Sequence, residues 1–63
     1  MNKELLVSIM TESFIKANIE LAISSGMSEE EASKIINPME DSISKCMNSV
    51  ADTLHSKFPE LLK

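Results

Sequence analysis

Several residue types on which catalytic and metal sites depend are missing or occur only once. The 63-residue chain has no arginine, tryptophan or tyrosine, and it has one cysteine, one histidine and one glycine. Cys46 and His55 are nine residues apart, which on one helix is about two and a half turns, too far for a nucleophile–base pair. No further cysteine or histidine stands at zinc-ligand spacing, and no calcium-loop pattern with its central glycine is present. We therefore expect no catalytic residue, no metal site and no cofactor, and hence no enzyme.

Long hydrophobic runs and a positive net charge are also absent. The longest uninterrupted apolar stretch is only a few residues, whereas a transmembrane helix needs about 20. Residues 1–10 lack the small-residue cleavage site of a signal peptide. Ten acidic residues against six lysines give a net charge of −4, which repels phosphate backbones and anionic lipid surfaces. We expect a cytoplasmic protein with no membrane partner, and nucleic acid is disfavoured as a ligand.

Apolar residues are plentiful, although few of them are aromatic. They make up 43% of the chain and aromatic residues only 3%, so a core has to be built from aliphatic side chains and methionine. A chain of this length forms one domain at most, 1–63, and buries only about 60% of the surface that its unfolded form exposes. Because such a domain is marginally stable alone, we expect a homo-oligomer.

The segment of about 2–25 contains no proline or glycine and is predicted to form the first helix. One apolar stripe at helical spacing is expected to meet the second helix; it consists of Leu6, Met10, Phe14, Ala17 and Leu21. Further apolar residues lie outside this stripe and are predicted to form the interface with a second copy or an unidentified protein partner; they are Leu5, Ile9, Ile15, Ile19 and Ile23. The first helix is thus apolar on more sides than one neighbouring helix covers.

A sharp turn at 26–28 follows the first helix. Gly26 stands where a left-handed residue ends a helix. Ser28 and Glu31 have the spacing of a capping box, which predicts that the next helix spans about 29–36. The short connection makes the two helices neighbours, and the length of the first stripe favours antiparallel packing.

Proline at position 38 leaves two interpretations of the second arm. Asn37 and Pro38 either begin a separate third helix, with Asn37 as its N-cap, or kink one continuous helix. An apolar stripe keeps its helical phase across the proline, which favours a nearly continuous arm with a last helix of about 38–57. The stripe consists of Ala32, Ile36, Met39, Ile43, Met47, Val50 and Leu54.

These patterns together predict the fold class. It is all-α, an antiparallel helical hairpin whose second arm is kinked or split at Asn37–Pro38, giving two to three helices that dimerise into a helical bundle. Cys46 falls on the apolar stripe of the second arm and is predicted to be a small buried thiol.

One segment resembles the helix-turn-helix of DNA-binding regulators. The run 22–28, followed by Ala32 and Ile35, has that motif's spacing of alanine, glycine and apolar residues. The helix that would enter the major groove begins with three glutamates, at 29–31, and has no arginine to contact guanine. A nucleic-acid-binding regulator is therefore the alternative to a plain helix-hairpin turn.

In its size, its acidity, its lack of diagnostic motifs and its all-helical pattern, the chain resembles the short accessory proteins encoded in the early region of lambdoid temperate phages. The resemblance covers the whole chain in general character and assigns a role to no residue. It implies a modulator of phage development or host physiology that acts by binding. The expected function is that of a small non-enzymatic regulatory or accessory protein acting through protein–protein interaction.

Overall fold

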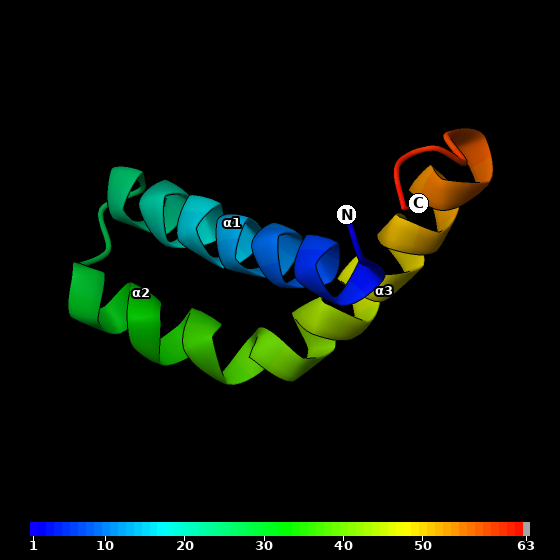
Figure 1. Cartoon of the computed structure of the whole chain (residues 1–63). Coiled ribbons are helices and arrows are strands. Elements are labelled where there is room, and N and C mark those ends of the chain that lie inside the picture. Colours follow the sequence, from blue (N-terminus) through cyan, green and yellow to red (C-terminus); the bar gives the residue numbers. More distant parts are fainter. Residues whose placement is uncertain (63) are drawn as a thin grey trace.

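A computed structural model describes residues 1–62, and the helices and turns in that range include no strand. The helices are α1 (Lys3–Ser24), α2 (Glu29–Ile36), the 3₁₀-helix η1 (Asn37–Met39) and α3 (Glu40–Lys57). Figure 1 shows α1 running antiparallel to a second arm made of α2, η1 and α3. The predicted all-α hairpin with a kinked second arm is confirmed, and its dimerisation stays a prediction. Lys63, the last residue of the predicted domain, lies outside the described residues.

Side-chain caps fix where α1 and α2 begin. Asn2 is extended, and its Oδ1 accepts a hydrogen bond of 2.7 Å from the Leu5 amide. Ser28 is also extended; its Oγ accepts from the Glu31 amide at 3.2 Å and donates to the Glu31 carboxylate at 3.0 Å. Each cap gives a partner to an amide that has none within the helix. The pairing predicted for Ser28 and Glu31 is therefore present.

The turn between the arms depends on the single glycine. Gly26 has a φ of +106°, a conformation that residues with a Cβ rarely adopt. Its amide donates to the Ile23 carbonyl at 3.0 Å, and the Met27 amide donates to the Ala22 carbonyl at 3.1 Å. This pair of bonds closes the last turn of α1 and reverses the chain direction within a few residues.

The proline junction bends the second arm and interrupts its α-helix with one 3₁₀ turn. Asn37 is helical (φ −57°, ψ −39°), so it is not the extended N-cap of a separate helix. Pro38 has no amide to continue the α-helical bonding, and the chain passes through η1 before α3 begins at Glu40. In Figure 1 the arm curves at this point, so that α2 and α3 point in different directions.

The two arms meet along a narrow line of mostly small side chains, which we call the seam. Its members are the five buried residues Val7, Thr11, Ala32, Ile43 and Ala51. Small side chains let the backbones approach closely, but they also leave little apolar surface buried between the arms. No side chain of the described residues is both large and fully buried.

The position of the seam corrects the predicted packing face of α1. Phe14 is 44% exposed and Leu21 is 65% exposed, and Ala17 is exposed as well, so much of the predicted stripe does not pack against the second arm. The line of contact runs instead through Val7 and Thr11, between two apolar stripes of α1. On the second arm the predicted stripe does face α1 except at two exposed positions, Met39 and Val50.

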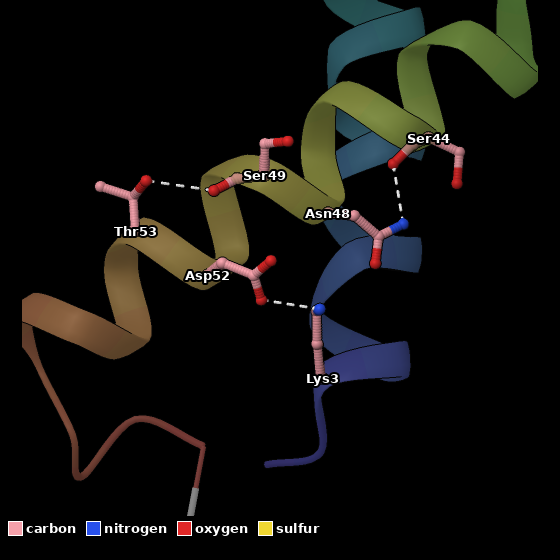
Figure 2. A network of polar contacts seen from close by, with 6 residues as sticks. All are labelled: Lys3, Ser44, Asn48, Ser49, Asp52 and Thr53. Carbon is pink, nitrogen blue, oxygen red and sulfur yellow. Dashed lines mark hydrogen bonds and ion pairs between the residues drawn. The ribbon is translucent and has the colours of Figure 1, made fainter.

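The hairpin is elongated and uneven at its open end. Its principal dimensions are 41 × 19 × 15 Å, and the end of α3 projects beyond the start of α1 (Figure 1). Lys3 and Asp52 join the two helices there through an ion pair of 2.7 Å (Figure 2). The neighbouring polar side chains bond within α3, as Asn48 does to the Ser44 carbonyl. Both ion-pair partners are largely exposed, so the pair contributes about 1 kcal/mol at most.

Candidate protein-interaction surfaces

The predicted interface residues lie on α1 beside the seam and are not part of it. Leu5, Ile9 and Ile23 are exposed, whereas Ile15 and Ile19 are half-buried. The last three isoleucines line one continuous hollow beside the second arm, and Leu5 and Ile9 lie outside it. Their role as an interface stays a prediction. The structure shows that residues of the second arm face the three isoleucines across this hollow.

This hollow, which we call the acidic groove, is an open channel of about 1000 Å³ between α1 and the second arm. Along α1 it is lined by apolar residues with charged residues at their edge: Glu4, Val7, Ser8, Thr11, Glu12, Ile15, Lys16, Ile19, Glu20 and Ile23. The second arm supplies a polar wall: Glu29, Ser33, Glu40, Asp41, Ser44 and Asn48. Six carboxylates and one lysine therefore surround an apolar floor.

The floor of the acidic groove is a row with a residue at every fourth position of α1: Val7, Thr11, Ile15, Ile19 and Ile23. Because an α-helix has about 3.6 residues per turn, a row with this spacing winds slowly around the helix. Val7 and Thr11 accordingly lie in the seam, the next two residues are half-buried, and Ile23 is exposed. The row thus forms a continuous ridge that leads from the seam to the open surface.

Thr11 is the polar member of this row. Its side chain is only 6% exposed, and its hydroxyl Oγ1 has no hydrogen-bond partner. An unpaired buried hydroxyl destabilises a fold by about 1–3 kcal/mol compared with a paired one. The position therefore weakens the hairpin.

The opposite flank of the seam carries a hollow without charged side chains. A second hollow of about 250 Å³ is lined by Phe14, Met39, Ser42, Ile43, Cys46 and Met47, and we call this surface the uncharged face. No ionisable acid or base other than the thiol is among these residues. It shares no lining residue with the acidic groove. Exposed Leu21 and Val50 extend it, since each is two turns along its helix from Phe14 or Ile43.

Residues with possible reactive roles do not come together. Cys46 is exposed, which corrects the prediction of a buried thiol. The reason is the turn of α3, which directs Ile43 and Ala51 into the seam and leaves Cys46 on the rim of the uncharged face. His55 is exposed near the end of α3. Within residues 1–62 no cluster of three or more histidine, cysteine or acidic residues is placed to hold a metal ion.

The helices are also too short or too polar to span a bilayer, as far as the described chain extends. Comparison with models of protein families, with curated proteins and with solved structures finds no match.

Sequence reasoning missed the uncharged face and the acidic wall of the groove. The apolar pattern predicts Phe14 in the packing between the arms, and it assigns no binding role to the acids at 40 and 41. Both surfaces combine residues from α1 with residues beyond the kink. The sequence signal that points to them is the spread of apolar residues around α1, which one neighbouring helix cannot cover.

Proposed function

We propose that the chain is a small regulatory or accessory protein that acts by binding other polypeptides and has no catalysis of its own. The observation that carries this proposal is the distribution of apolar surface. Large apolar side chains are exposed on both flanks of the seam, among them Leu5, Ile9, Phe14, Leu21 and Ile23. Exposed apolar surface of this extent favours a role in protein contact.

The uncharged face is the surface that suits a second copy of this chain. Two copies of an acidic protein repel one another unless they meet where neither carries charge. Phe14 and Met39 from one copy would cover the same hollow of the other, as the two-fold symmetry of most dimers requires. Pairing through this face would complete a four-helix bundle and bury the apolar surface that the hairpin leaves exposed.

A single charge on the uncharged face is expected to abolish this self-association. The variant Phe14→Glu places a carboxylate opposite its own copy across the two-fold axis, and we expect the dissociation constant to rise by about 100-fold or more. Size-exclusion chromatography with light scattering, over a range of protein concentrations, measures the change. Glu12→Gln on another face of α1 is the control, since it should leave the mass unchanged. A native chain that stays monomeric at every concentration would refute the proposed dimer.

The helix-turn-helix alternative predicts a different behaviour. It requires salt-sensitive binding to duplex DNA, with α2 in the major groove. We expect no mobility shift of duplex DNA even at low salt, because Glu29, Glu30 and Glu31 are exposed at the start of α2 and would face the phosphates. A shift that disappears as salt rises would favour the DNA-binding alternative.

The biological process is proposed from the resemblance alone. A chain of this size and acidity that acts by contact would suit a modulator of phage development or host physiology. Its cellular place is proposed to be the cytoplasm, where such partners occur.

A further inference from the structure

We propose that the acidic groove binds an amphipathic helix of a partner protein, with an apolar face toward α1 and a polar face rich in lysine or arginine. This inference rests on the proposed function, action by protein contact, and names the class of partner. The acidic groove stays open when two copies pair through the uncharged face, because the two surfaces share no lining residue.

The carboxylates of the acidic groove favour a cationic helix over a second copy of this chain as the occupant. Glu4, Glu12 and Glu20 lie along α1, and Glu29, Glu40 and Asp41 face them from the second arm, with Lys16 as the single cation of the groove. A second copy docked here would bring its own six carboxylates against these six. A helix with lysine or arginine on both edges of its apolar face would meet an acidic residue on either side of the groove.

The dimensions and shape of the floor also fit a helix. The row from Val7 to Ile23 covers 17 residues of α1, a length of about 24 Å, so an occupant of about 16 helical residues spans it. Rows of residues four apart form the ridges that pack into the grooves of a neighbouring helix. The occupant would therefore cross α1 obliquely and place its apolar side chains between successive isoleucines.

The test uses two synthetic peptides and the full chain. One peptide has about 16 residues. Leucine recurs every three and then four residues, which places the leucines on one face of a helix, and lysine occupies the remaining positions. Its twin has glutamate in place of every lysine. By isothermal titration calorimetry we expect saturable binding of the lysine peptide, weakened by salt, and no binding of the twin. Equal binding of the two peptides, or of neither, would overturn the proposal.

Two adjacent glutamates provide a matched pair of variants. Glu29 lines the acidic groove and Glu30 does not, although both are exposed in the first turn of α2. Glu29→Lys is expected to weaken binding of the lysine peptide by about fivefold, and Glu30→Lys by less than about twofold. An equal loss of affinity in the two variants would show that the peptide responds only to the net charge of the protein. That result would overturn the placement of the peptide in the acidic groove.

Titration of the lysine peptide into Phe14→Glu tests the acidic groove independently of the proposed dimer. We expect the monomeric variant to bind the lysine peptide as the native chain does, because Phe14 does not line the acidic groove. Loss of binding in this variant, with its helical content retained, would place the peptide on the uncharged face and overturn the inference. A native chain that is monomeric yet binds the peptide would refute the dimer and support the groove.

Discussion

Replacement of Ile43 by aspartate is expected to unfold the chain. Ile43 is the largest apolar side chain of the seam and is only 8% exposed, so the substitution buries a carboxylate with no cation placed to pair with it. We expect a loss of about 3 kcal/mol or more in the free energy of unfolding. A domain of this length has about 3–9 kcal/mol in total, so much of the population should lose its helical circular dichroism at 25 °C.

The control for this experiment is the same change at Ile9. Ile9 is 46% exposed on α1 and lines neither surface described above, so aspartate there stays hydrated. Ile9→Asp is expected to cost less than about 1 kcal/mol, chiefly through lower helix propensity. Equal destabilisation by the two variants would contradict the placement of the seam along Ile43.

The second large effect is expected at Ala51, one of the two fully buried alanines of the seam. Ala51 is 0% exposed, so a leucine at this position has no space unless α1 and α3 move apart. Overpacking of this kind costs about 1–3 kcal/mol. For a domain of this size we expect the melting temperature of Ala51→Leu to fall by about 4–8 °C for each kcal/mol.

Ala17→Leu serves as the matched substitution for Ala51→Leu. Ala17 is an exposed helical alanine of α1, so the added side chain projects into solvent and the helix tolerates it. Its melting temperature should change by less than about 2 °C. If Ala51→Leu were as stable as Ala17→Leu, the arms would not be in close contact at this point.

Features that depend on a few neighbouring residues were predictable from the sequence. Gly26 and Ser28 set the turn through backbone geometry and a local hydrogen bond, and neither depends on the rest of the fold. The phase of the apolar stripe across Pro38 likewise depends on helix geometry alone, and it predicted the second arm that is kinked and joined from α2, η1 and α3.

The rotation of α1 about its own axis could not be predicted in the same way. Apolar residues surround most of this helix, so burial alone gives no single preferred face. In the structure Val7 and Thr11 are the buried residues of α1, whereas Phe14 and Leu21 stay exposed. A prediction based on hydrophobicity therefore placed the larger side chains in the seam.

The candidate groove was predictable only on one of its sides. The row containing Ile15, Ile19 and Ile23 was visible as excess apolar surface on α1. The facing acids at 40 and 41 belong to the arm beyond the kink, and their direction depends on how far η1 rotates α3 relative to α2. That rotation is a property of the assembled hairpin.

The separation of the two surfaces on opposite flanks of the seam has a consequence for affinity. A pair of chains joined through the uncharged face would be bivalent, with one acidic groove on each chain. A target that offers two cationic helices within reach of both grooves would bind the second one intramolecularly, and avidity would then exceed single-site affinity by about 10²–10⁴-fold. Two weak sites on a very small protein would in this way discriminate between targets by the spacing of their helices.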